Sequence, residues 1–203
     1  MPSAVTEREF YLDTNAYLRL AEVLHPLLKL TFGQPQARLR TIPDVHDEFK
    51  RSVRLQTHFS WAMDQKFCED RKASFPRISV ATRKQIVSER DYLLDDARWR
   101  DLPVSQTDMF VLAYGLVMKQ VVVSDDRGMK TIADDYGVAM IGVADFLALL
   151  YNEGGITIEK IKDVVDVMEL RHDVPNRSYF YFMLGELYKM AEMKANAKNG
   201  IDR

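Results

Sequence analysis

The chain has 203 residues, 47% hydrophobic and 29% charged, which is typical of a folded globular protein of one domain with additions or two small domains. Its formal net charge of −2 argues against a protein that coats nucleic acid without specificity, because such proteins are clearly basic. The single cysteine, Cys68, excludes an intrachain disulfide and a cysteine-rich zinc site. Together with the lack of an apolar stretch of about 20 residues and of a secretory signal pattern in residues 1–9, it predicts a cytoplasmic protein without a membrane partner.

Hydrophobic periodicity predicts an alternation of strands and helices. Apolar residues that recur every three or four positions favour helices, and short apolar or β-branched runs favour strands. In chain order these patterns predict a strand at 10–12, a helix at 13–23, an ambiguous segment at 27–42, a helix from Pro43, a helical insert at about 55–100, a helix at 105–119, a strand at 121–123, a helix ending at Gly137, a strand at 138–141 and a helix at 143–151. This order predicts an α/β fold, a three-layer α/β/α sandwich with a mostly parallel central sheet.

The pair Gly154-Gly155 marks the clearest boundary in the chain. Beyond it, two helical stripes separated by Pro175 predict a C-terminal helical extension over residues 155–203. The apolar faces of these helices suit packing on the main domain, a homodimer contact or a contact with a partner protein.

Acidic residues lie at the ends of the predicted strands and on the helices of the same α/β pattern. They are Asp13, Glu48, Asp108, Asp125 and Asp126. Acids placed in this way converge outside the carboxyl edge of a parallel sheet. Crowded carboxylates repel one another unless a cation holds them, and Mg²⁺ and Mn²⁺ prefer oxygen ligands. The placement therefore predicts a site for one or two Mg²⁺ or Mn²⁺ ions, with Asn15 and Ser124 as hydrogen-bonding groups that orient the carboxylates.

Each acid also has an ordinary structural explanation. The first and third acids suit helix capping. Among the helical acids Asp44, Asp47 and Glu48, we favour Glu48 as the ligand, and the other two suit a solvated surface. Asp125 and Asp126 fit either a simple turn or a metal ligand, and the choice between them stays open. His46-x-Glu48 is a weak metal motif, and a solvated histidine is expected at position 46.

Charge is distributed unevenly along the chain. Residues 50–100 contain 12 Lys and Arg against 7 Asp and Glu, whereas the rest of the chain contains 16 basic and 23 acidic residues. A basic segment beside an acidic cluster suits a metal-dependent phosphodiesterase, since the basic part attracts a phosphate backbone. The candidates for nucleic-acid binding are Arg51, Arg54, Lys72, Arg83 and Lys84. The alternative is a set of solvated helix faces without a partner.

Four motifs, taken in order, resemble the PIN-domain family. They are Leu12-Asp13-Thr14-Asn15, the helix with Glu48, Ser105-x-x-Asp108-x-x-Val111-Leu112-Ala113, and Val123-Ser124-Asp125-Asp126-Arg127. The resemblance covers residues 9–150 and implies a PIN-like nuclease domain dependent on Mg²⁺ or Mn²⁺, an endoribonuclease that acts on single-stranded RNA. It implies catalytic, metal-binding acids at Asp13, Glu48, Asp108 and Asp126. Asn15 matches the family's polar residue after the first acid.

The same resemblance bears on partners and on competing functions. Many family members are toxins of toxin–antitoxin pairs, so an antitoxin is one expected partner beside RNA. The insert and the C-terminal extension depart from the compact toxin members and leave the toxin role and the substrate open. A non-catalytic PIN-like module that binds RNA or a protein is the alternative. A phospho-acceptor receiver domain fits less well, because its adjacent acids follow the first strand, whereas here they come late.

Overall fold

The computed structural model describes residues 8–201. Residues 1–7, which form most of the segment considered as a secretory signal, and residues 202–203 of the predicted extension lie outside the described residues. Within the described part, no helix combines the length and the apolar character needed to cross a membrane.

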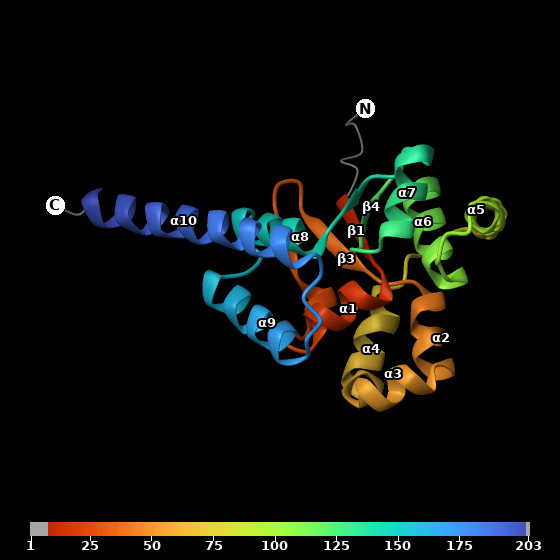
Figure 1. Cartoon of the computed structure of the whole chain (residues 1–203), viewed down its shortest axis with the longest axis horizontal. Coiled ribbons are helices and arrows are strands. Elements are labelled where there is room, and N and C mark those ends of the chain that lie inside the picture. Colours follow the sequence, from red (N-terminus) through yellow and green to blue (C-terminus); the bar gives the residue numbers. More distant parts are fainter. Residues whose placement is uncertain (1–7, 202–203) are drawn as a thin grey trace.

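Strands and helices are interspersed along the chain, with a run of helices over residues 43–118 (Figure 1). The elements, including two short 3₁₀ helices labelled η, are β1 (Arg8–Leu12), α1 (Thr14–Ala21), η1 (Leu27–Lys29), β2 (Thr31–Phe32), β3 (Ala37–Arg40), α2 (Pro43–Arg51), α3 (Val53–His58), η2 (Ser60–Met63), α4 (Gln65–Ser74), α5 (Val80–Trp99), α6 (Gln106–Met118), β4 (Val121–Val123), α7 (Arg127–Tyr136), β5 (Met140–Ile141), α8 (Val143–Asn152), α9 (Ile158–Leu170) and α10 (Arg177–Ile201).

The described strands form one five-stranded sheet in the order β2-β3-β1-β4-β5. The strand β1 lies at its centre and pairs in parallel with β3 and β4, β4 pairs in parallel with β5, and only β2 is antiparallel to its neighbour. Leu12 is in register with Val123, so β1 and β4 end side by side. The residues that follow them, Asp13 and Ser124, therefore begin at the same edge of the sheet.

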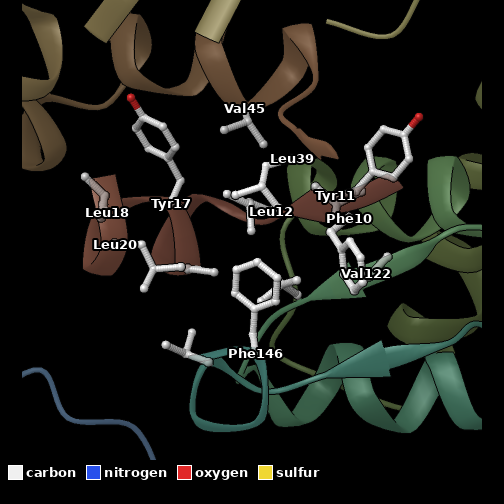
Figure 2. Packing of buried hydrophobic residues seen from close by; sticks show 14 of the residues in the cluster. Phe10, Tyr11, Leu12, Tyr17, Leu18, Leu20, Leu39, Val45, Val122 and Phe146 are labelled. Carbon is white, nitrogen blue, oxygen red and sulfur yellow. The ribbon is translucent and has the colours of Figure 1, made fainter. Parts of the chain in front are cut away.

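Helices cover both faces of the sheet. Successive side chains of a strand point to opposite faces, and both Phe10 and Tyr11 of β1 are buried. Phe10 contacts Phe146 of α8, with ring centroids 5.5 Å apart, whereas the next residue, Tyr11, contacts Tyr114 of α6 at 5.7 Å. Figure 2 shows the same division, with Val45 of α2 and Phe146 on opposite sides of β1. The α/β class and the three-layer α/β/α sandwich predicted from the sequence are confirmed.

Two parts of the sheet differ from the expected elements. The ambiguous segment at 27–42 contains η1, β2 and β3, whose alternating burial extends over only four residues and includes two arginines, too short a pattern to identify from the sequence. The strand expected at 138–141 is confined to Met140–Ile141. Gly137 ends α7 with a positive φ, and Val138 is still bonded to that helix through its backbone N–H.

The predicted insert and extension lie on different parts of the core. The insert contains most of α3 together with η2, α4 and α5, and α5 packs along α6. In the extension, α9 packs on α1 and α10 packs on α8 before running out from the body (Figure 1). The division into a nuclease domain at 9–150 and an extension at 155–203 remains a prediction.

The insert is fixed to the core by a fully buried arginine of α4. Arg71 donates hydrogen bonds to the hydroxyl oxygen of Tyr17 (3.1 Å), to the backbone oxygen of Ala62 (2.7 Å) and to Nδ1 of His46 (3.2 Å). These bonds link α4 to α1, α2 and η2. They satisfy a guanidinium that would otherwise be costly to bury.

Candidate functional site

Asp13 directly follows the central strand β1. It caps α1, and its Oδ1 accepts a hydrogen bond from the backbone N–H of Ala16 at 2.6 Å. Its Oδ2 accepts a hydrogen bond from the hydroxyl of Ser124 at the end of β4. The side chain is buried, with the residue only 2% exposed. A cap needs no such burial, so capping alone does not account for this environment.

Two further acids lie at helix N-termini. Asp126 caps α7 and accepts a hydrogen bond from the backbone N–H of Met129 at 2.7 Å. Asp108 forms a reciprocal capping box with Ser105, through hydrogen bonds of 2.7 and 3.1 Å. The backbone N–H groups and the positive end of each helix stabilise a negative charge at these positions.

Glu48 is connected to a residue adjacent to Asp13. The hydroxyl of Thr14 donates a hydrogen bond to Oε2 of Glu48 at 2.6 Å, which brings the α2 acid to the start of α1. The other two acids of α2 have different partners, because Asp44 pairs with Arg83 and Asp47 pairs with Lys50. Of the three helical candidates, Glu48 is therefore the one directed towards Asp13.

The carboxylates influence one another electrostatically. Burial raises the pKa of Asp13 to about 7, against hydrogen bonds from Ser124 and Ala16 that lower it, and the charge of Asp108 raises it further. Burial also raises the pKa of Asp108, and the charges of Asp126 and Glu48 add to this effect. A like charge raises the pKa of a carboxyl group only when the two groups lie near each other. Asp108 is therefore within electrostatic range of Asp13, Glu48 and Asp126, and these four acids are called the acidic cluster.

Asp125 has a different set of contacts. Its Oδ2 pairs with Arg19 of α1 at 3.1 Å, and its Oδ1 accepts a hydrogen bond from the backbone N–H of Val143 at 3.1 Å. Arg19 also pairs with Asp173, in the connection between α9 and α10, at 2.7 Å. Burial raises the pKa of Asp125 and the charge of Arg19 lowers it. Asp125 therefore connects α1 and α8, and the geometry favours Asp126 over Asp125 as the fourth acid.

The donor chemistry suits a hard cation, but the ligands are not assembled around a common point. In residues 8–201, no group of three or more His, Cys, Asp and Glu side chains is arranged to hold a metal ion. Among the described residues, Glu48 and Asp126 each use one carboxylate oxygen in the bonds given above, and the second oxygen of each can serve as a ligand. Mutual repulsion keeps such groups apart, and a cation would offset that repulsion.

The other residues predicted from the sequence are mostly exposed. Asn15 lies in the first turn of α1 with its side chain exposed, whereas Ser124 contacts Asp13 directly. Of the basic candidates, Arg83 is bonded to Asp44 and to the hydroxyl of Tyr114. The exposed candidates are Arg51, Arg54, Lys72 and Lys84.

His46 corrects one expectation and illustrates what the sequence does not reveal. It was expected to be solvated, but it is buried, and its Nδ1 accepts a hydrogen bond from Arg71. Burial and the neighbouring positive charges lower its pKa to about 4. The roles of Thr14 and Arg19 were not predicted, because their partners Glu48 and Asp125 are distant in the sequence and no local pattern identifies such contacts.

No family model matches the chain. No curated protein matches it either. Among solved structures, VapBC-1 from nontypeable Haemophilus influenzae is similar with a TM-score of 0.43 and 14% identity, over 66% of this chain and 98% of that chain. FitAcB from Neisseria gonorrhoeae has a TM-score of 0.43 and 13% identity, over 66% of this chain and 97% of that chain. VapBC2 from Rickettsia felis, bound to a DNA fragment from its promoter, has a TM-score of 0.39 and 14% identity, over 66% of this chain and 98% of that chain.

These comparisons overturn the assignment to the PIN-domain family that was made from the motifs. No family model recognises the chain, and a structural likeness with a TM-score of 0.43 at 14% identity does not establish membership. The fold class stands on the sheet topology of the chain itself. Any functional conclusion must therefore come from the acidic cluster.

Proposed function

We propose that this protein is a metal-dependent endoribonuclease, which hydrolyses phosphodiester bonds of single-stranded RNA. The observation that carries the proposal is the environment of Asp13, a buried carboxylate with a pKa raised to about 7. It lies at the end of the central strand and is repelled by the charge of a second acid, Asp108. Maintaining such a group costs stability, and perturbed acids are concentrated at functional sites.

Mg²⁺ or Mn²⁺ fits the oxygen donors of this cluster, and we assign its ligands to Asp13, Glu48, Asp108 and Asp126. When bound, the cation would act as a Lewis acid that activates water and offsets charge on the phosphoryl oxygens.

The roles of the surrounding residues follow from their contacts. Ser124 and Thr14 fix the orientation of Asp13 and Glu48 by donating hydrogen bonds. Such contacts hold ligands in position and raise affinity for the ion. The exposed basic residues of α2, α3, α4 and α5 attract the RNA backbone in this proposal. The antitoxin partner and the homodimer stay predictions from the sequence.

Two measurements test the proposal. Calorimetric titration of Mn²⁺ should give saturable binding to the parent protein and none to Asp13→Asn. A matched control is Asp95→Asn, which changes a highly exposed acid of α5 and should leave binding unchanged. In parallel, cleavage of single-stranded RNA and DNA oligonucleotides is followed with Mg²⁺, with Mn²⁺ and with EDTA.

We expect cleavage of RNA that needs the metal and is lost in Asp13→Asn. The nuclease function is refuted if purified Asp13→Asn cuts as fast as the parent, with contaminating nuclease excluded. RNA binding without metal binding or cleavage would instead support the non-catalytic module.

A further inference from the structure

A cavity of about 280 Å³ lies beside the acidic cluster. The start of α7 contributes Asp126 and Arg127 to its walls, and the start of α8 contributes Asp145. The beginning of α10 closes the cavity with Tyr179 and Phe180. Because Asp126 belongs to both the cavity and the acidic cluster, a ligand in the cavity would lie next to the proposed site of hydrolysis. The volume is small for a binding pocket, and it suits one flat ring system better than several.

The wall from α10 contains an aromatic ring that is held in place but remains accessible. Tyr179 is 41% exposed, although its hydroxyl donates a hydrogen bond of 2.6 Å to Oδ1 of Asp145. The adjacent Phe180 is buried and anchors this turn of α10 to the core. A fixed, partly exposed aromatic ring is the kind of platform on which nucleobases stack in proteins that bind single-stranded nucleic acid.

The cavity lining also contains carboxylates that accept hydrogen bonds. Asp145 uses Oδ1 for Tyr179, which leaves Oδ2 as an acceptor within the described residues. Gly142 keeps the wall open, because a Cβ there would lie 2.8 Å from Oδ1 of Asp125 and 3.7 Å from Oδ2 of Asp145. Asp125 itself is engaged by Arg19. An acceptor at this position favours a ligand edge that donates, as the exocyclic amino groups of cytosine, adenine and guanine do.

A cationic side chain also lines the cavity. Arg127 is exposed at the first position of α7, directly after Asp126. A guanidinium at this position suits a phosphate that continues from a base in the cavity. The cavity thus combines an aromatic ring, a carboxylate acceptor and a cation, which are the groups that suit the base and the phosphate of a nucleotide.

We propose that this cavity is a nucleobase subsite, in which a base with an exocyclic amino group, such as cytosine or adenine, stacks on Tyr179 and donates that amino group to Asp145. The placement of the adjoining phosphate at the acidic cluster rests on the proposed nuclease function. The base recognition itself depends only on the cavity. In this arrangement, the predicted C-terminal extension supplies part of the substrate site.

The test uses the full chain in EDTA, so that base binding is measured without metal and without cleavage. Cytidine, adenosine and uridine are titrated by calorimetry, and their contacts are detected by saturation-transfer NMR. The variants are Tyr179→Ala, Tyr179→Phe and Asp145→Asn. The matched control is Tyr181→Ala, because Tyr181 lies on the same helix, is also 41% exposed and bonds instead to Glu169 outside the cavity.

We expect cytidine and adenosine to bind more tightly than uridine. Tyr179→Ala should weaken binding by on the order of ten-fold, since it removes the stacking platform. Tyr179→Phe retains the ring and should stay within about two-fold of the parent, as should Tyr181→Ala. Asp145→Asn should reduce the preference over uridine. Circular dichroism verifies that each variant is folded.

Equal binding to the parent and to folded Tyr179→Ala, or equal loss in Tyr181→Ala, would overturn the subsite. So would the failure of all three nucleosides to bind. If RNA is cleaved and Asp13→Asn abolishes cleavage while nucleosides do not bind, the subsite alone is wrong. If nucleosides bind as expected but no metal-dependent cleavage occurs, the base pocket stands and its placement beside a hydrolytic centre is wrong.

Discussion

Replacing Asp13 with asparagine should stabilise the metal-free protein near neutral and mildly alkaline pH. Burial raises the pKa of this carboxyl from 3.8 to about 7 in the folded protein. Asparagine preserves the shape and caps a helix about as well as aspartate. Its amide group can donate to the hydroxyl of Ser124, in place of the hydrogen bond that Asp13 accepts from it.

The magnitude and the sign follow from proton linkage. Because the folded-state pKa is raised, the folded protein binds more protons than the unfolded chain between about pH 4 and 7, and its stability falls as pH rises through this window. The shift of about 3 units corresponds to a loss of roughly 4 kcal/mol in the free energy of unfolding. This loss is complete above the folded-state pKa and absent below the unfolded-state pKa. The advantage of Asp13→Asn over the parent should therefore grow by about 3 kcal/mol between about pH 5 and pH 8.

Urea denaturation in EDTA at about pH 5 and pH 8 measures this difference for both proteins. The control Asp95→Asn changes an exposed acid and should show a nearly constant difference from the parent across the same range. The reasoning is refuted if the advantage of Asp13→Asn does not change with pH. It is also refuted if the variant is less stable than the parent at about pH 8, since Asp13 would then be ionised at no cost.

Three other substitutions test the contacts around the site. Arg71→Met should cost at least about 3 kcal/mol in urea denaturation, because it leaves three buried acceptors without their donor, and a loss below about 1 kcal/mol would contradict that role. Ser105→Ala should cost about 1 kcal/mol by removing one half of a capping box, and an unchanged denaturation midpoint would show that the cap is dispensable. Gly142→Ala should cost about 1–3 kcal/mol, since its Cβ would lie 2.8 Å from Oδ1 of Asp125. Gly185→Ala is its control, because a Cβ there meets nothing within 4 Å. This substitution should stabilise α10 by up to about 1 kcal/mol. Equal changes in stability at both glycines would contradict the steric argument.

Much of the fold could be predicted because it depends on local patterns. The apolar run before Asp13 predicted β1, and the β-branched run at 121–123 predicted β4. The capping position of Asp108 was also predicted, since Ser105 lies three residues before it. The strands at 31–40 were missed, because their alternation is short and becomes decisive only when β3 pairs with β1.

The composition of the candidate site required distant contacts. The sequence favoured Glu48 over Asp44 and Asp47, and the hydrogen bond from Thr14, 34 positions away in the chain, supports that choice. The pairing of Asp125 with Arg19, 106 positions apart, likewise distinguished it from Asp126.

The sequence by itself determined the helices, the central strands, the α/β class and the set of acids that could form a cluster, because propensity, periodicity and capping act within a few neighbouring residues. Only the tertiary structure decided which of those acids lie together, that His46 is buried beneath Arg71 and that Tyr179 closes a cavity beside Asp126. Each of these outcomes depends on packing between elements that are remote along the chain, and the exposure, charge and hydrogen-bond partners of a side chain are set by that packing.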